Sequence, residues 1–334
     1  MACRIGINGF GRIGRMVLRR TMALPDIDVV AINDLANIGD LTYLLKYDSV
    51  HGRFPDEVAD NGKSISIRGQ AVQFTSEREP AKIPWGAAGV DVVIESTGAL
   101  RGRSDASGHL QGGVRKVLIS APSDDVDVTI VPGVNDTMYD STRHQVISMA
   151  SCTTNSLAPV AKVLQEHFGI VHLLITTVHA YTASQSIMDK PTRKRRRGRA
   201  AALSMIPTST GAAKATALVL PELAGKIDGM AIRVPIPDGS VTDIVAQLET
   251  STNAQEINAR LQAASQQPPL QGILEVNDDE IVSVDVIGNA HSSIVDAPAT
   301  MVLNGTMAKV LAWYDNEWGY ACRLAELADR LIAV

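Results

Sequence analysis

The chain has 334 residues, of which 45% are hydrophobic and 20% charged, and its formal net charge is −5. This composition is typical of a soluble globular protein with a sizeable core, the length favours two domains over one, and the net negative charge argues against a general nucleic-acid binder. The three cysteines are too few and too scattered for a disulfide framework, which favours a reducing, cytoplasmic compartment, and neither a zinc-type Cys/His spacing nor an apolar run of membrane-spanning length occurs.

The first half of the chain alternates short apolar runs with helical patterns. The runs are rich in Val and Ile without polar alternation, as in strands that are buried on both faces of a parallel sheet. The sequence predicts a helix over 12–23 and an inserted hairpin within 53–74, with a turn at 60–62. The predicted strands cover residues 4–8, 29–33, 91–95, 116–120, 128–131 and 146–149.

A glycine-rich turn directly follows the first predicted strand. Its glycines, Gly9, Gly11 and Gly14, have the G-x-G-x-x-G spacing and precede a predicted helix, as a dinucleotide-binding turn requires. Asp34 ends the second strand, 20 residues after Gly14, where a carboxylate can accept hydrogen bonds from both adenosine ribose hydroxyls. The sequence therefore predicts a Rossmann-type α/β domain that binds NAD.

Cys152 lies at the predicted start of the next helix, and a predicted strand ends 27 residues later at His179. The positive end of the helix dipole and a neighbouring imidazole are expected to lower the pKa of the thiol. A Cys and a His on adjacent element ends suit a sulfur nucleophile and its base. Together with a redox dinucleotide, this pair implies aldehyde oxidation through a thioester. The alternative, a small buried Cys, fits Cys3 and Cys322 better, because Cys152 has polar neighbours.

The second half has longer strands that partly alternate between polar and apolar residues. We predict strands over 171–180, 229–235, 242–249, 281–286 and 309–314, and helices over 211–219, 254–264 and 317–331. This pattern indicates an α+β domain with a mostly antiparallel sheet. The predicted division is a cofactor domain over 1–150, joined by a C-terminal helix within 316–334, and a catalytic domain over 151–315, with the active site in the cleft between them.

Several segments of the chain resemble the phosphorylating glyceraldehyde-3-phosphate dehydrogenases, and the similarity runs essentially end to end. It is carried by INGFGRIGR (7–15), ASCTTN (150–155), TSTGAAK (208–214), RVP (233–235) and WYDNEWGY (313–320). The resemblance implies that D-glyceraldehyde 3-phosphate is oxidised with NAD and inorganic phosphate to 1,3-bisphosphoglycerate. Cys152 would attack the aldehyde through a thiohemiacetal and a thioester. His179 would take protons and, with the Cys152 N–H, hold the oxyanion.

The resemblance also implies the binding residues. Thr182 and Arg233 would bind the substrate phosphate. The attacking phosphate and the aldehyde region would be bound by Ser151, Thr153, Arg199, Thr210 and Gly211. The cofactor would be held by Gly9, Gly11, Arg12, Ile13, Gly14, Asp34, Arg78, Ser120 and Asn316, and no metal is expected. Asn316 would orient the nicotinamide carboxamide.

The segment 190–199 carries seven positive charges in ten residues; we call it the basic loop. Taken alone, it is typical of a nucleic-acid patch or a localisation signal. The resemblance instead implies a homotetramer in which this loop reaches a neighbouring subunit's cofactor. Lys190 stands where relatives carry Leu near the adenosine ribose, which leaves NADP as an alternative cofactor. Two competing functions are erythrose-4-phosphate dehydrogenase activity and nucleic-acid binding through the basic loop. Thr182 and segment 208–211 favour the glyceraldehyde-3-phosphate activity, because they keep a second phosphate site.

Overall fold

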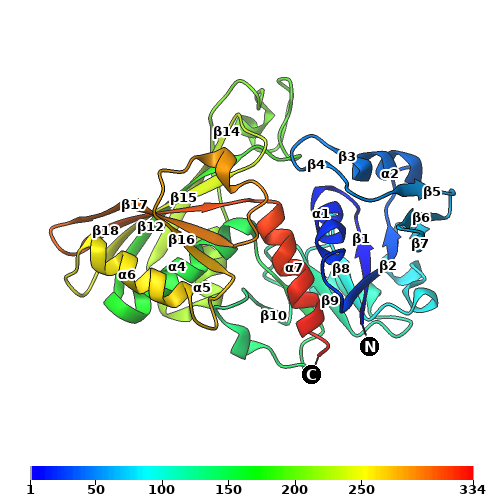
Figure 1. Ribbon diagram of the computed structural model, residues 1–334, viewed down its shortest axis with the longest axis horizontal. Helices are drawn as coiled ribbons and strands as arrows, with labels where there is room; N and C mark the ends of the chain where they lie inside the picture. The colour runs from blue at the N-terminus through cyan, green and yellow to red at the C-terminus, as the bar shows by residue number, and fades with distance from the viewer. Residues whose placement is uncertain (1, 334) are drawn as a thin grey trace. The chain divides into compact units, whose positions relative to one another are not determined.

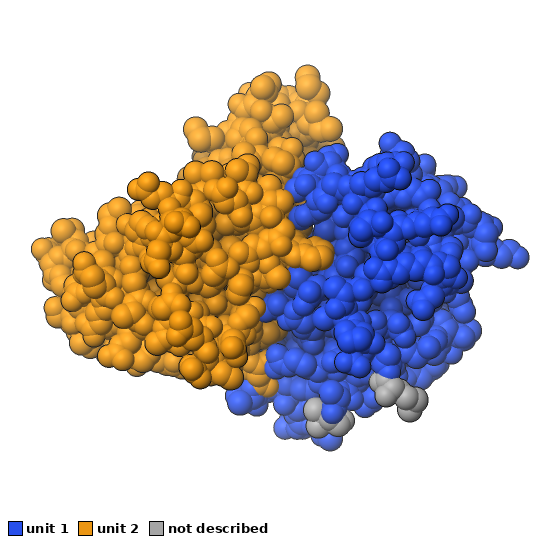
Figure 2. Space-filling view, in the orientation of Figure 1, with its two compact units in different colours: residues 1–130, 137–150, 321–334 blue, residues 131–136, 151–320 orange. Residues whose placement is uncertain are grey.

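The computed structural model describes residues 2–333, which form two compact units (Figure 2). Unit 1 comprises 2–130, 137–150 and 321–333, and unit 2 comprises 131–136 and 151–320. The described helices include none that is both long and apolar enough to cross a membrane. The chain therefore enters the main part of unit 2 at residue 151 and returns to unit 1 at residue 321.

Among the described residues, unit 1 is built on a nine-stranded sheet in the order β10-β11-β9-β8-β1-β2-β7-β6-β5. The strands from β10 to β7 pair in parallel, and β5 and β6 add an antiparallel edge. The inner strands β8, β9 and β11 are buried at every position, as their Val- and Ile-rich sequences predict. The strands are β1 Cys3–Asn8, β2 Ile27–Asn33, β5 Val58–Asp60, β6 Ser64–Ile67, β7 Gln70–Thr75, β8 Val92–Glu95, β9 Lys116–Ile119, β10 Val128–Thr129 and β11 Val146–Ser148.

The strand order of unit 1 reverses around β1. The chain first moves from β1 to β2 and β7, and then crosses back to β8 on the other side of β1. In open α/β sheets, ligands bind beyond the carboxyl ends of the strands at such a switch point. The glycine turn after β1 lies at that point. The helices of unit 1 are α1 Arg12–Thr21, α2 Ile38–Lys46, α3 Arg103–Ala106 and most of α7 Trp318–Arg330, and a small second ladder joins β3 Tyr47–Asp48 to β4 Gly52–Arg53.

In the described residues, unit 2 has a seven-stranded sheet in the order β13-β14-β12-β15-β18-β17-β16. It is antiparallel except for the pairs β12–β14 and β16–β17, so the predicted α+β class is confirmed. The helix α4 Cys152–Phe168 packs on the sheet together with α5 Ala212–Val219 and α6 Ala254–Ser265 (Figure 1). The strands are β12 Ile170–Ala180, β13 Ile206–Ser209, β14 Ile227–Val234, β15 Ser240–Leu248, β16 Leu274–Asn277, β17 Ser293–Leu303 and β18 Met307–Tyr314.

The strand predicted over 281–286 is wrong. The structure has a short 3-10 helix there, Ser283–Val286, and the nearby strands are β16 and β17. The reason is local: the carboxylate of Asp285 accepts a hydrogen bond from the backbone N–H of Val282, which closes a turn in place of a ladder. The other 3-10 segments are Pro80–Lys82, Trp85–Ala88, Ser107–His109, Asp136–Met138, Arg195–Gly198 and Pro221–Leu223.

Candidate active site

The glycine turn of unit 1 has the geometry of a dinucleotide cradle. Gly9 has φ +91°, and a Cβ there would lie 2.6 Å from the backbone N of Thr97. A Cβ on Gly14 would collide with the carbonyl oxygen of Gly9, whereas a Cβ on Gly11 would meet nothing within 4 Å. The first and third glycines are therefore required by the fold itself, and the second leaves the backbone open to a bound pyrophosphate.

Asp34 is fixed beside this turn at the end of β2. Its carboxylate accepts hydrogen bonds from the backbone N–H of Phe10, at 2.6 Å, and of Ala36, at 2.9 Å. A pocket of about 390 Å³ at this edge of the sheet is lined by the predicted cofactor residues Gly9, Gly11, Asp34 and Arg78, together with Asn8, Asn33, Leu35, Glu77, Ser96, Thr97, Ala99 and Leu100. These residues fit a dinucleotide, because they combine a close backbone approach with a rigid carboxylate.

The remaining predicted cofactor residues of unit 1 lie outside this pocket lining. Arg12, Ile13 and Gly14 are in the first turn of α1, and Ser120 follows β9. Arg12 forms a 2.6 Å ion pair with the buried Asp48.

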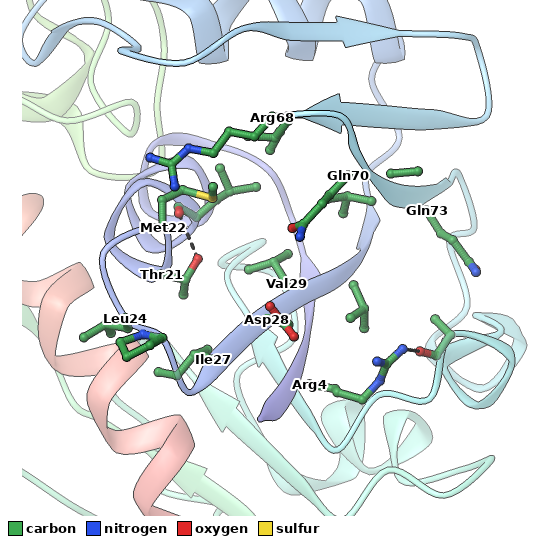
Figure 3. Close-up of a pocket in the computed structure, with 17 residues that line it drawn as sticks. Arg4, Thr21, Met22, Leu24, Ile27, Asp28, Val29, Arg68, Gln70 and Gln73 are labelled. Carbon is green, nitrogen blue, oxygen red and sulfur yellow. Dashed lines mark hydrogen bonds between the residues drawn. The ribbon is translucent and has the colours of Figure 1, made fainter. Parts of the chain in front are cut away.

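A second cavity of unit 1, of about 430 Å³, lies elsewhere, between the end of α1, the start of β2 and the β6–β7 hairpin (Figure 3). Two arginines line it, but their guanidinium groups already bind protein groups: Arg4 donates to the carbonyls of Ala88 and Gly89, and Arg68 pairs with Asp56. This cavity is not the candidate site.

In unit 2, Cys152 is the first residue of α4. Ser151 caps the helix, since its Oγ accepts a hydrogen bond from the N–H of Thr154 at 3.1 Å. The preceding Ala150 is buried with φ +55°, a left-handed conformation that costs a non-glycine residue about 1–2 kcal/mol. Such strain persists only where the surroundings impose it, and it often marks functional sites.

Cys152 and His179 meet, as predicted from their positions at element ends. The distance from Cys152 Sγ to His179 Nε2 is 3.5 Å, and His179 is the second-last residue of β12. His179 is buried, while Cys152 keeps some exposed surface. The arrangement places a thiol and an imidazole within reach of one proton transfer, as a sulfur nucleophile and its base require.

Tyr314 holds this pair in place. Its hydroxyl is bonded to the Thr153 Oγ1 at 2.9 Å and the Thr177 Oγ1 at 2.8 Å, so it links the start of α4 to β12. Its ring packs edge-on against the His179 ring, at 5.9 Å between centroids. Sequence reasoning did not single out Tyr314; the available signal was a tyrosine at the end of a core strand, within the WYDNEWGY motif.

The electrostatics of the pair differ from the sequence-based expectation. Desolvation raises the pKa of Cys152 to about 11, although the charge of Arg233 and hydrogen bonds from Thr153 act in the opposite direction. Desolvation, reinforced by Arg233, lowers the pKa of His179 to about 3. The expected lowering of the thiol pKa by the helix end is therefore wrong for this structure, because burial outweighs the dipole. A thiolate at Cys152 would therefore need a proton acceptor within reach, and His179 Nε2 lies 3.5 Å from the sulfur.

Arg233 lies directly beside His179, because β14 pairs in parallel with β12 in the register His179–Arg233. Its Nη1 is 2.6 Å from His179 Nδ1 and 2.8 Å from the Ala180 carbonyl oxygen. Thr182, assigned with it to the substrate phosphate, bonds to the Ser184 hydroxyl at 2.9 Å and lines a cavity of about 440 Å³.

The residues predicted to bind the attacking phosphate are only partly brought together. Thr210 and Gly211 lie at the start of α5, where the Thr210 hydroxyl accepts from the N–H of Ala212. Arg199 is instead paired with Asp189 at 2.9 Å, and its side chain is 67% exposed.

Arg197, which sequence reasoning did not assign, contacts the residues that directly precede Thr210 and Gly211. Its Nε donates to the Thr208 hydroxyl at 2.9 Å and its Nη2 to the Ser209 carbonyl at 3.4 Å. Its charge also contributes to lowering the pKa of His179. Three consecutive arginines precede Gly198, so sequence alone could not show which guanidinium faces the site.

Asn316 is oriented within unit 2. The Ser240 hydroxyl donates to the Asn316 side-chain carbonyl at 2.5 Å and accepts from the N–H of Ala180 at 3.1 Å. The amide nitrogen of Asn316 is therefore the end that can meet an acceptor, as a nicotinamide carboxamide would offer.

Family models match most of the chain: the glyceraldehyde 3-phosphate dehydrogenase NAD-binding domain matches residues 3–103, and the C-terminal domain of the same enzyme matches residues 151–316. The chain belongs to the glyceraldehyde-3-phosphate dehydrogenase family. Over 328 residues, 98% of each chain, it is 55% identical to the glyceraldehyde-3-phosphate dehydrogenase of Geobacillus stearothermophilus. It is 53% identical to that of Streptomyces coelicolor and 52% identical to glyceraldehyde-3-phosphate dehydrogenase 1 of Bacillus subtilis, with the same coverage.

Membership of the glyceraldehyde-3-phosphate dehydrogenase family confirms the resemblance noted from the sequence motifs. The C-terminal domain match spans Cys152, His179, Arg233 and Asn316, and the NAD-binding match spans the glycine turn, Asp34 and Arg78. The two family matches therefore cover the dinucleotide turn and the Cys152–His179 contact.

Proposed function

We propose that this protein is an NAD-dependent phosphorylating aldehyde dehydrogenase that converts D-glyceraldehyde 3-phosphate to 1,3-bisphosphoglycerate. The observation that carries the proposal is the 3.5 Å contact between Cys152 Sγ and His179 Nε2 in a chain of this family. Residues 1–150, with the C-terminal helix, serve the cofactor, and 151–315 serve the chemistry. Three free cysteines, two of them buried, support a reducing, cytoplasmic compartment.

The chemistry of the chain's own residues follows from their positions. Cys152 Sγ attacks the aldehyde carbon while its proton passes to Nε2 of His179, forming a thiohemiacetal. The Cys152 N–H and His179 stabilise the oxyanion. Bound NAD would supply the hydride acceptor, and loss of a hydride from the thiohemiacetal carbon would leave a thioester on Cys152. An oxygen of inorganic phosphate then attacks the thioester carbon, and the Cys152 sulfur leaves.

The cofactor is held by the glycine turn, Asp34 and Arg78. Arg12 and Ile13, which follow β1, and Ser120, which follows β9 of the same sheet, also bind it. Asn316 orients the carboxamide. The substrate phosphate is bound by Thr182 and Arg233. For the attacking phosphate we propose Ser151, Thr153, Thr210 and Gly211, with Arg197 as the cation in preference to Arg199.

A steady-state assay tests the proposed function. NADH formation should require D-glyceraldehyde 3-phosphate and should fall sharply when inorganic phosphate is omitted, since the thioester is then released only by water. Faster turnover of erythrose 4-phosphate than of glyceraldehyde 3-phosphate would contradict the substrate assignment.

The two arginines of the basic loop can be separated by mutation. Arg197→Ala should raise the KM for inorganic phosphate about tenfold or more, because it removes a guanidinium beside Thr208 and Ser209 and such an interaction contributes about 1.5–3 kcal/mol. Arg199→Ala is the matched comparison, since it removes only an exposed ion pair. Initial rates at varied phosphate decide between them; a larger effect of Arg199→Ala would restore the sequence-based assignment.

We expect NAD to be preferred over NADP. A 2′-phosphate about 4 Å from the Asp34 carboxylate is repelled by roughly 4 kcal/mol at an effective dielectric of about 20, before relaxation and screening. Asp34 cannot easily turn away, because two backbone N–H groups hold it. Lys190 could offset this repulsion, so kcat/KM for both cofactors should be measured in the wild type and in Lys190→Leu. A wild type that is faster with NADP would show that the basic loop sets the preference.

The protein is also proposed to be a homotetramer that covers the basic loop. Large apolar side chains beside the loop are strongly exposed in the single chain: Ile187 84%, Met188 75%, Leu203 85% and Met205 75%. Exposed apolar clusters of this kind mark association surfaces. Light scattering at micromolar concentration should therefore report an oligomer whose stability depends on ionic strength, because the loop's cations must be compensated when buried. A monomer that binds DNA would instead support the exposed basic patch.

A further inference from the structure

The imidazole Nδ1 of His179 has two competing partners. It lies 2.8 Å from the Ala180 carbonyl oxygen and 2.6 Å from Nη1 of Arg233. A carbonyl oxygen can only accept a hydrogen bond, and a guanidinium can only donate one. Nδ1 of a neutral imidazole carries either a proton or a lone pair, so these two contacts require opposite tautomers.

The two tautomers differ in what they offer Cys152. With the proton on Nδ1, donated to Ala180, the lone pair of Nε2 faces the sulfur 3.5 Å away and can take the thiol proton. With Nδ1 accepting from Arg233, the proton sits on Nε2, and the imidazole cannot act as a base toward the thiol. The doubly protonated form has no lone pair for Arg233 and is repelled by it, in keeping with the lowered pKa of His179.

The other groups that face His179 do not resolve this conflict. Tyr314, from β18, packs edge-on and has its hydroxyl bound by two threonines. Arg197, from the basic loop, adds positive charge and opposes protonation of the imidazole. Arg233 is therefore the group whose position decides the tautomer.

Arg233 also needs an anion. Among the described residues it forms no ion pair with a carboxylate, and its buried Nε has no hydrogen-bond partner. Desolvation lowers the pKa of its guanidinium. A phosphate dianion offers the paired oxygens that the planar guanidinium fits best, and this charge-assisted interaction is stronger than the contact with a neutral imidazole.

We propose that the substrate's phosphate, by binding Arg233, draws the guanidinium away from His179 Nδ1 and so switches His179 to the tautomer that accepts the thiol proton. The switch moves one proton from Nε2 to Nδ1 and neither adds nor removes one. Arg233 is thus a positioning residue for the base in addition to its role as a phosphate ligand, and the nucleophile is activated only when the phosphate of the substrate is present. This inference rests on the proposed function, which assigns the substrate phosphate to Arg233.

The tautomer can be observed directly by nitrogen NMR of the full-length protein labelled with ¹⁵N-histidine. Glycerol 3-phosphate is the probe, because it carries the phosphate but no aldehyde. We expect the Nδ1 signal of His179, identified by its loss in His179→Asn, to change from an unprotonated to a protonated nitrogen when the probe saturates. A protonated Nδ1 in the ligand-free protein, or no change at saturation, would overturn the proposal. This readout is independent of whether the protein has the proposed activity.

A kinetic test uses glyceraldehyde, which lacks the phosphate. In single-turnover formation of NADH without added anions, Arg233→Met should oxidise glyceraldehyde at least threefold faster than the wild type, because Nδ1 is released. Phosphite dianion should accelerate the wild type and leave Arg233→Met unchanged. A residue that only bound phosphate would give no difference without anions, and a structural residue would give a slower variant; either result refutes the switch. Arg233→Lys, which keeps the charge but shortens the reach to Nδ1, should also exceed the wild type with glyceraldehyde alone.

Discussion

Cys152→Ala is expected to abolish covalent catalysis and to lower kcat by about four orders of magnitude or more, as removal of a nucleophile does in other enzymes. No thiohemiacetal or thioester can form without the sulfur. The cofactor turn and Asp34 belong to unit 1 and do not depend on Cys152, so NAD affinity should stay near that of the wild type. Rapid-quench mass spectrometry should find the acyl group in the wild type and none in the variant.

The control for this assignment is selective alkylation. One equivalent of iodoacetamide should label Cys152 before Cys3 or Cys322, because the last two are buried and Cys152 keeps some exposed surface. Desolvation raises the pKa of Cys3 to about 12, which further disfavours its thiolate. Labelling of Cys3 or Cys322 first would contradict the assignment of the nucleophile.

His179→Asn should lower kcat about 10²–10⁴-fold, the usual contribution of a general base, with a smaller effect on the KM of the aldehyde. Without its proton acceptor, the thiol cannot pass its proton to a neighbouring imidazole, while burial still raises the pKa of Cys152. With saturating glycerol 3-phosphate, which holds His179 in its proton-accepting tautomer, the rate of alkylation by iodoacetamide should then rise with pH over a more alkaline range in the variant than in the wild type.

The matched control is His172→Asn on the same strand, β12. His172 lies near the start of that strand with its side chain exposed, whereas His179 lies near the end and contacts Cys152. Substitution of His172 should leave both kcat and the alkylation profile unchanged. An alkylation profile of His179→Asn that coincides with the wild type would remove His179 from the activation of the thiol.

Local sequence signals predicted much of the fold and the chemical groups. The G-x-G-x-x-G spacing after an apolar strand predicted the turn, because Gly9 and Gly14 have no room for a side chain. Cys152 was predicted to lie at a helix start, and in the structure the Ser151 hydroxyl caps that helix, serving the first backbone N–H groups within a few residues. These features depend on neighbours in the chain, so they can be read without the fold. Segment 281–286 shows the limit, because one carboxylate there turned an apolar run into a 3-10 helix.

Tertiary structure alone decided how the site works. The placement of Arg233 against His179 follows from the register of β14 on β12, which joins residues 54 positions apart. The role of Tyr314 follows from three separate elements, α4, β12 and β18, meeting at its hydroxyl. The raised pKa of Cys152 follows from desolvation by side chains brought in from distant parts of the chain. The sequence by itself determined which chemical groups the protein has and where most of its strands and helices begin. Register and burial depend on contacts between remote residues, and they decided which guanidinium contacts His179 and in which direction the pKa of Cys152 is shifted.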